Sequence, residues 1–309
     1  MKRLVEKNDG VWFTWGWGKY GQLGQGDERN QALPRVLDRV AFKGASIEEL
    51  GCGFCYNVAV SKRGDVYTWG YGKHGQLGHP EKLGQALRVP TKIKSLMQKG
   101  VSYVAAGCEH TCCVTREGNV FSWGCGAYGM LGQGNRQDQY TPKMLDYFND
   151  QQVKIMKVAC GNKHTVAIGQ DDEGAPAVYS WGFGGNGRLG VGDELNRLSP
   201  VRVELVDTAK PATEACDNPL QLGRHALIVD VKCGWAHSLL LSETGCVFSF
   251  GQGKHGQLGH GNTSDVTRPE QITRWIHERD KTKAQAMFCS CSFLYIISLR
   301  QPLSLTAGI

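Results

Sequence analysis

The sequence contains five copies of a glycine-rich motif that, taken alone, could bind a dinucleotide. The first copy reads Gly16-Trp17-Gly18-Lys19-Tyr20-Gly21. A dinucleotide site needs a helix directly after this loop and an acidic residue near the end of the next strand. Here Gln-Leu-Gly or a close variant follows, and the motif returns in every repeat of the chain. We therefore interpret it as a tight turn between strands and expect no cofactor.

Histidine and cysteine are the next candidates, because both residue types bind metal ions. They recur at two repeated positions: His110, His164 and His237 at one, and Cys52, Cys160, Cys233 and Cys289 at the other. Equivalent positions of a repeat lie in separate structural units, whereas a closed zinc site needs four ligands at one point. Cys52 and Cys55 have the spacing of half a zinc site or of a redox pair, but no second pair follows at a suitable distance.

We therefore interpret the histidines as structural side chains and the recurring cysteines as small core residues. No Ser-His-Asp order, pair of carboxylates or phosphate-binding loop stands out. The sequence predicts no catalytic residue, no bound metal and no cofactor, which favours a protein that is not an enzyme.

An internal repeat must position all of these residues. One signature is a Val-aromatic-x-Trp-Gly run before the glycine-rich turn. Its anchor aromatics, spaced 54, 54, 58 and 69 residues apart, are Trp15, Trp69, Trp123, Trp181 and Phe250. The second signature lies between these runs and reads Ala159-Cys160-Gly161-Asn162-Lys163-His164 in its clearest copy. Together the two signatures closely resemble the repeat of the regulator of chromosome condensation family, over roughly residues 10–298.

Each repeat divides into four short strands, the fourth of which carries a proline near its start. Proline suits an outer edge strand, where no ladder N–H is needed. Four strands per repeat are typical of a propeller blade. We therefore predict an all-β protein, a β-propeller of the regulator of chromosome condensation type. We expect a single domain, with repeats at residues 10–63, 64–117, 118–173, 174–244 and 245–298.

The two ends of the chain supply complementary halves of a blade. The chain opens with strands three and four of a repeat and finishes with strands one and two. We predict that these halves form one composite blade, which would close a ring of five four-stranded blades and remove its exposed strand edges. The best-known members of the family have seven blades, so the alternative is that this chain is part of a larger ring.

The overall composition limits the choice of partner. The net charge is +6 and the isoelectric point about 8.7, with Lys and Arg scattered along the chain. This balance permits an acidic partner but does not indicate strong nucleic-acid binding. The longest apolar run, residues 293–297, is too short to span a bilayer. We expect no membrane contact and a cytoplasmic or nuclear location.

Several residues are candidates for contact with another protein. Trp17 and Trp235 occupy turn positions where an exposed Trp would be a natural contact residue. Glu109 and Lys163 directly precede the repeat His. The long fourth repeat indicates an insertion between residues 203 and 228, and such loops are often functional. The candidate contacts within this insertion are Lys210, Glu214 and Asp217.

The resemblance implies a protein-interaction platform with another protein as its partner. The alternative is a guanine-nucleotide exchange factor for a Ran-like small GTPase, as the founding member of the family is. One functional loop of that family carries an acid directly before the repeat His, and of the aligned residues here only Glu109 is acidic. A UV-B-type photoreceptor is less favoured, because Gly234-Trp235-Ala236-His237-Ser238 resembles its Gly-Trp-Arg-His-Thr motif only once and has Ala236 in place of Arg.

Overall fold

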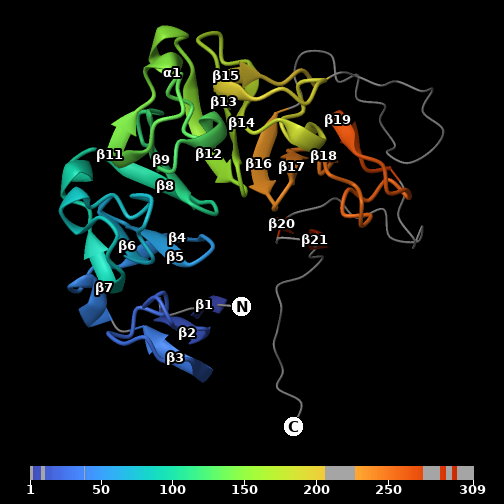
Figure 1. Cartoon of the computed structure of the whole chain (residues 1–309). Coiled ribbons are helices and arrows are strands. Elements are labelled where there is room, and N and C mark those ends of the chain that lie inside the picture. Colours follow the sequence, from blue (N-terminus) through green and yellow to red (C-terminus); the bar gives the residue numbers. More distant parts are fainter. Residues whose placement is uncertain are drawn as a thin grey trace.

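The computed structural model of the chain describes residues 3–7, 11–37, 39–205, 227–273, 286–289 and 294–297. Its strands form antiparallel sheets that follow one another along an arc (Figure 1). Four of the sheets contain four strands each, and all four have the strands in sequential order. The predicted all-β, propeller-type fold and its five-repeat layout are confirmed.

The strand bounds show the regularity of these four sheets. The second sheet along the chain contains β4 (Ile47–Cys52), β5 (Tyr56–Ser61), β6 (Val66–Gly70) and β7 (Leu87–Lys92). The third contains β8 (Val101–Ala106), β9 (His110–Thr115), β10 (Val120–Gly124) and β11 (Gln139–Met144). The fourth contains β12 (Lys154–Cys160), β13 (His164–Gln170), β14 (Pro176–Gly182) and β15 (Arg197–Arg202). The fifth contains β16 (Ile228–Cys233), β17 (His237–Ser242), β18 (Val247–Gly251) and β19 (Val266–Gln271).

Smaller elements complete the described chain. The first sheet contains β1 (Arg3–Lys7), β2 (Val11–Gly16) and β3 (Gln31–Leu37), and a separate pair contains β20 (Ala286–Cys289) and β21 (Leu294–Ile297). The helical segments are short: η1 (Arg39–Phe42), η2 (Pro80–Lys82), η3 (Lys94–Leu96), η4 (Ala127–Gly129), α1 (Asp146–Asp150) and η5 (Gly185–Gly187). Within the described residues, no helix has the length and apolar character needed to cross a membrane.

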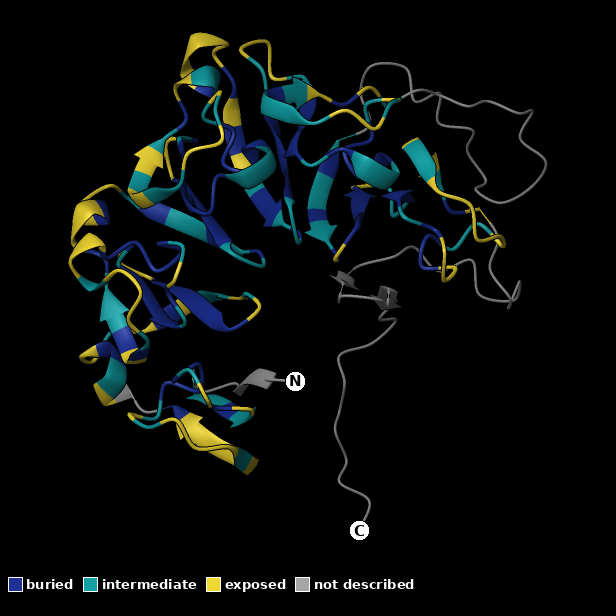
Figure 2. Cartoon of the chain, viewed as in Figure 1, coloured by how far each residue is buried: buried dark blue, intermediate teal, exposed yellow. Residues whose placement is uncertain are grey.

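The core lies between neighbouring blades rather than inside any one of them. The middle strands β5 and β6 are buried at every residue, because both faces of their sheet pack on other sheets. One apolar cluster around Trp181 combines side chains from β8, β9, β12 and β14, which belong to two successive sheets. Outer strands such as β3 are mostly exposed (Figure 2), which agrees with the prolines that they carry.

Hydrogen bonds join each blade to the next at one repeated point. The Trp123 Nε1 and Thr111 Oγ1 atoms both donate to the Gln76 carbonyl of the preceding blade, at 3.0 and 2.7 Å. Equivalent bonds run from Trp69 and Asn57 to Gln22, from Trp181 and Thr165 to Met130, and from Ser238 to Arg188. The anchor aromatics therefore stabilise the contact between blades as well as the core.

The glycine-rich turns are explained by close packing between blades. Gly75 has a φ of +79°, and a Cβ there would lie 2.6 Å from the Tyr140 ring on the outer strand of the next blade. Only glycine combines this left-handed conformation with the space available. This contact requires the third glycine of the GxGxxG motif, and atoms of the same blade crowd the other two, Gly70 and Gly72. A phosphate site is therefore not needed to explain them.

The predicted composite blade is wrong in its strand pairing. β2 pairs with β1, in the register Leu4↔Thr14, whereas β21 pairs with β20. β20 lies against β16 and β17, at the far end of the arc from β2. β1 and β2 are separated by three residues, so their hairpin needs far less loop-closure entropy than a pairing between the two chain ends.

Candidate functional site

Both repeated signatures place their turns on the same face of the arc. Strand two of each blade begins opposite the end of strand three, as in the pairs His110↔Gly124 and His164↔Gly182. The residue after each of these glycines donates its N–H to the carbonyl of the residue before the histidine, for example Cys125 to Glu109 at 2.9 Å. We call this surface the turn face; it comprises residues 17–24, 53–55, 71–78, 107–109, 125–132, 161–163, 183–190, 234–236 and 252–259.

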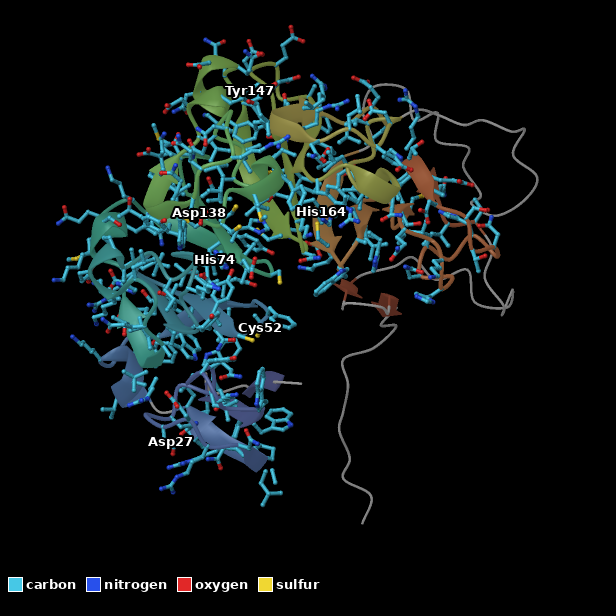
Figure 3. All side chains as sticks on the ribbon, in the orientation of Figure 1. Asp27, Cys52, His74, Asp138, Tyr147 and His164 are labelled. Atoms are coloured by element: carbon cyan, nitrogen blue, oxygen red, sulfur yellow. The ribbon has the colours of Figure 1, made fainter. Side chains whose placement is uncertain are left out.

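The recurring histidines lie buried beneath the turn face and link neighbouring blades. The His110 Nε2 atom is 2.9 Å from the Thr165 hydroxyl, and His164 Nε2 is 2.9 Å from the Ser238 hydroxyl. Burial lowers the pKa of His110 to about 3 and that of His237 to about 4. Burial likewise lowers the pKa of His164, which Figure 3 labels beneath this face. The neutral rings therefore support the turns, as the structural interpretation predicts.

One group of potential metal ligands is visible only in the folded chain. Atoms of His110, Cys112 and Cys160 lie within 4.8 Å of one another, although they belong to two blades. Burial raises the pKa of the Cys160 thiol well above its ordinary value, and metal binding needs a deprotonated thiolate. The Cys160 sulfur also lies 3.8 Å from the Ala105 carbonyl oxygen, as a donor. This environment favours a packed, protonated thiol over a metal ligand.

Aromatic side chains cover the turn face at the first two blades. The Trp17 and Tyr20 ring centroids are 5.3 Å apart, and those of Tyr20 and Tyr71 are 4.7 Å apart. Trp17 is nevertheless 41% exposed. The turns of two blades thus hold this Trp in place while leaving much of its ring open to a partner.

Charged groups occupy the next junction along the arc. His74 lies between two carboxylates, with Nε2 3.6 Å from Glu109 and Nδ1 3.7 Å from Asp138. His74 and Asp138 are labelled in Figure 3. Asp138 also accepts a 2.8 Å hydrogen bond from the Gly126 N–H. The Glu109 side chain is 43% exposed, so its carboxylate is both anchored by a neighbour and accessible.

Two cations meet an aromatic pair at the junction of the third, fourth and fifth blades. The Lys163 ammonium lies 4.5 Å from the Tyr128 ring centroid, and the Arg188 guanidinium lies 4.7 Å from that of Phe183. The two aromatic centroids are 5.0 Å apart. Arg188 also donates to the Trp235 carbonyl at 3.5 Å, which ties this group to the fifth blade.

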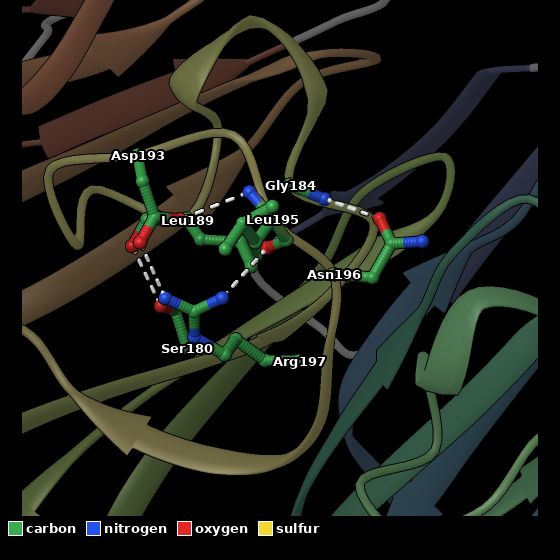
Figure 4. Close-up of polar contacts among 7 residues, drawn as sticks. All are labelled: Ser180, Gly184, Leu189, Asp193, Leu195, Asn196 and Arg197. Atoms are coloured by element: carbon green, nitrogen blue, oxygen red, sulfur yellow. Dashed lines mark hydrogen bonds and ion pairs between the residues drawn. The ribbon is translucent and has the colours of Figure 1, made fainter.

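The turn that carries Phe183 and Arg188 is held by its own polar contacts (Figure 4). The Arg197 guanidinium is 2.6 Å from the Asp193 carboxylate, and Asn196 accepts the Gly184 N–H at 3.1 Å. The Leu195 N–H donates to Asp193 at 2.9 Å, and this bond lowers the pKa of that carboxyl. These bonds fix the backbone of the turn without using the Phe183 or Arg188 side chains.

Trp235 and Phe54 face each other from blades that are not neighbours. Their ring centroids are 6.3 Å apart in an edge contact, although Phe54 belongs to the second sheet and Trp235 to the fifth. The two side chains, Phe54 and Trp235, are 61% and 39% exposed, respectively. The turns between strands one and two therefore converge toward the centre of the arc and present two aromatic rings there.

The structure brings some of the predicted contact residues together and separates others. Lys163 and Trp235 lie in adjacent turns, because the Trp235 carbonyl accepts the N–H of Asn162 at 3.3 Å. Trp17 lies at the other end of the turn face, and Glu109 lies between. The remaining three, Lys210, Glu214 and Asp217, lie outside the described residues, as does the insertion at residues 206–226.

Sequence reasoning missed five members of this surface: Phe54, His74, Tyr128, Phe183 and Arg188. For His74 and Tyr128 the available signal was their place in the repeat. Tyr20, His74, Tyr128, Asn186 and His255 each follow an anchor aromatic by five residues. At the first three of these positions the side chain contacts the turn of the next blade.

Comparison with known proteins agrees with this architecture. The regulator of chromosome condensation (RCC1) repeat matches residues 9–60, 63–114, 117–168, 177–241 and 244–297. The ultraviolet-B receptor UVR8 of Arabidopsis thaliana is 35% identical over 259 residues, which are 84% of this chain and 53% of the receptor. The human E3 ubiquitin-protein ligase HERC2 is 31% identical over 85% of this chain, but over only 5% of its own length.

Solved structures show the same fold. Human WBSCR16 gives a TM-score of 0.77 at 22% identity, over 96% of this chain and 69% of that protein. Prp20p of Saccharomyces cerevisiae gives a TM-score of 0.72 at 20% identity, over 96% of this chain and 66% of its own. The structure of Prp20p is described together with its binding properties to Gsp1p and histones. The repeats, the sheets and the turn face define a propeller-type repeat protein. The chain belongs to the RCC1 repeat family, and it spans about half the length of UVR8.

Proposed function

We propose that this chain is a non-catalytic interaction module whose turn face binds a partner protein. The observation that carries the proposal is the pair of tryptophans, Trp17 and Trp235, that rigid turns hold 41% and 39% exposed on one face. Partly exposed Trp side chains with nearby charged groups are typical of binding hot spots. A rigid scaffold also spares a partner the entropic cost of ordering the surface.

Binding by relatives supports this proposal. Prp20p, which shares the fold, binds Gsp1p and histones. Fold likeness alone does not transfer a partner, whereas the exposed side chains of this chain are properties of its own surface. An interaction module of this kind would meet its partner in the cytoplasm or the nucleus.

The test is affinity capture with the chain as bait, comparing the wild type with Trp235→Ala and Trp17→Ala. We expect each substitution to lower the affinity for a captured partner by about tenfold or more, because a hot-spot residue contributes about 2 kcal/mol to binding. The matched control is Leu195→Ala, since Leu195 is 65% exposed but lies outside the turn face. Equal capture by the wild type and both Trp variants would rule out the turn face as the interface.

Guanine-nucleotide exchange on a Ran-like small GTPase is the second candidate function. Glu109 favours it, because this accessible carboxylate directly precedes the repeat His, where the family has a functional acid. The test follows release of a fluorescent GDP analogue from a Ran-like GTPase. We expect the chain to accelerate release and Glu109→Gln to abolish most of the acceleration, with Glu117→Gln as the control on an exposed hairpin turn. If the chain leaves the release rate unchanged, exchange activity is excluded for that GTPase.

A further inference from the structure

Arg188 is a buried cation on the turn face. Its side chain donates to three neutral oxygens: the Gly185 carbonyl at 2.8 Å, the Asn186 side chain at 3.0 Å and the Trp235 carbonyl at 3.5 Å. The residue is only 5% exposed. Burial lowers the pKa of the guanidinium to about 10, which leaves it charged at neutral pH. The charges of Asp265 and Glu194 stabilise the guanidinium, but among the described residues no carboxylate lies within 4.0 Å of it. An anion in direct contact would relieve more of the desolvation cost of this buried charge.

Lys163 places a second positive charge beside the same aromatic ring. Its ammonium lies 5.8 Å from the Phe183 centroid, whereas the Arg188 guanidinium lies 4.7 Å from that centroid. Among the residues that the structure describes, every ion pair within 4.0 Å involves other cations, so neither Lys163 nor Arg188 has a carboxylate partner. Two cations thus converge on Phe183 without a carboxylate in contact.

The carboxylates nearby have other roles. Asp265 accepts the Gly253 N–H at 2.8 Å and the Asn186 amide at 2.9 Å. Glu109 and Asp138 both face His74. The charges of Asp265 and Glu194 raise the pKa of Arg188, but neither carboxylate forms an ion pair with it in the described part of the chain. Direct contact with Lys163 and Arg188 is therefore left to an external anion.

We propose that Lys163 and Arg188 bind a carboxylate of an acidic protein segment, with an apolar side chain of that segment packed on Trp235 and Phe54. This inference rests on the proposed function, because it specifies the chemistry of the partner at the turn face. Arg188 contacts the Trp235 backbone, so the cationic and aromatic parts of the site are physically continuous. The site therefore selects a segment that combines an acidic residue with a large apolar one.

An acidic protein segment fits this site better than a nucleic acid. Arg188 is 5% exposed, so a single protruding side chain reaches it more readily than the backbone of a duplex. Glu109 on the face and Asp138 beside it lie at the neighbouring junction with His74. They would repel a polyanion long enough to extend over that junction, whereas a short segment bound at Lys163 avoids them. Nucleic-acid binding instead relies on many scattered phosphate contacts.

The experiment uses fluorescence anisotropy with three labelled probes: a peptide of alternating Glu and Trp, the same peptide with Lys in place of Glu, and a short DNA duplex. We expect the acidic peptide to bind most tightly and its affinity to fall as salt rises. Lys163→Gln should weaken it by about two- to fivefold, and Lys163→Glu by more, because a surface charge contact contributes up to about 1 kcal/mol. Lys143→Gln, on the exposed outer strand β11, is the matched control and should change nothing.

Several outcomes would overturn the inference: equal binding of the lysine peptide, tighter binding of the duplex, or no effect of either Lys163 substitution. Lys163 is a surface turn residue, so its variants test the site without the risk of unfolding that Arg188 substitutions carry. If Trp235→Ala abolishes capture of a partner while Lys163→Glu does not, the interface stands and the anion site fails. If neither changes capture, the proposed interface itself fails.

Discussion

At the scale of single residues, the repeated histidines show how the chain holds a neutral polar group in its core. The Nε2 atoms of His110 and His164 each meet a hydroxyl of the next blade at 2.9 Å. In the second sheet Tyr56 replaces the histidine, and its hydroxyl donates to the His110 carbonyl at 2.5 Å. Either side chain can therefore link two blades, provided that it remains uncharged.

This burial predicts that the protein loses stability in mild acid. An unfolded histidine has a pKa of about 6.5, whereas His110 and His237 have folded pKa values of about 3 and about 4. As the pH falls below about 6.5, these histidines bind protons in the unfolded state but not in the folded state, so the free energy of unfolding decreases. The decrease continues down to the folded pKa values. We expect a loss of about 1 kcal/mol per histidine between pH 7.5 and 5.5.

Urea unfolding at the two pH values measures this effect. His110→Gln should flatten the pH dependence, because it removes one of the groups that titrate only on unfolding. His255→Gln, at an exposed turn position, should leave the slope as in the wild type. A stability that does not change between these pH values would contradict the assignment of neutral buried histidines.

At the scale of elements, the first sheet shows where repeat reasoning stopped too early. Residues 3–7 precede Gly10 by the same spacing by which residues 57–61 precede Gly64. In the structure both segments form strand two: Leu4 pairs with Thr14 as Val58 pairs with Thr68. The repeat pattern before Gly10 could have predicted β1, but its charged residues hide the apolar alternation of the other copies.

This pairing predicts different effects of trimming the two ends. Deleting residues 1–9 should speed hydrogen exchange at the β2 amides that face β1, by about tenfold or more, because these amides lose their ladder partners. Deleting residues 290–309 should leave β2 amides protected, since β21 pairs with β20. Exchange measured by mass spectrometry on both truncated chains distinguishes the cases. Faster exchange in β2 after the C-terminal deletion would restore the composite blade.

At the scale of the whole molecule, repeated contacts between blades set the shape of the arc. The Gln22, Gln76 and Met130 carbonyls each accept bonds from the anchor Trp and from strand two of the next blade. Identical contacts impose a similar angle between successive blades. The arc in Figure 1 therefore leaves β3 and β19 apart instead of closing a ring.

Small-angle X-ray scattering tests this shape in solution. We expect the measured profile to match the open arc, with a longer maximum dimension than a closed ring of five blades would have. The same scattering experiment on the chain lacking residues 1–9 serves as a control for the contribution of β1. A profile that fits only a compact closed ring would show that the blades change their relative angle to bring the ends together.

The exposed tryptophans of the candidate site were predictable from the sequence, whereas the role of Arg188 was not, because it depends on contacts between blades. Trp17 and Trp235 stand out because a Trp interrupts a repeated turn position, which a sequence can show. Arg188 does not stand out, because Gln or Met occupies the same position in other repeats. Its importance comes from the Phe183 ring and the Trp235 carbonyl, and the latter is 47 residues away in the chain.

The sequence alone determined the family, the all-β class and the position of each turn, because these follow from periodic spacing and from glycines that local geometry requires. Only the tertiary structure decided how the ends pair, which histidines and cysteines meet, and which described cations have no carboxylate in direct contact. Those features depend on contacts between blades about 50 residues or more apart, as in the bond between His110 and Thr165. Repeat spacing specifies each blade, whereas packing between blades specifies the surface they share.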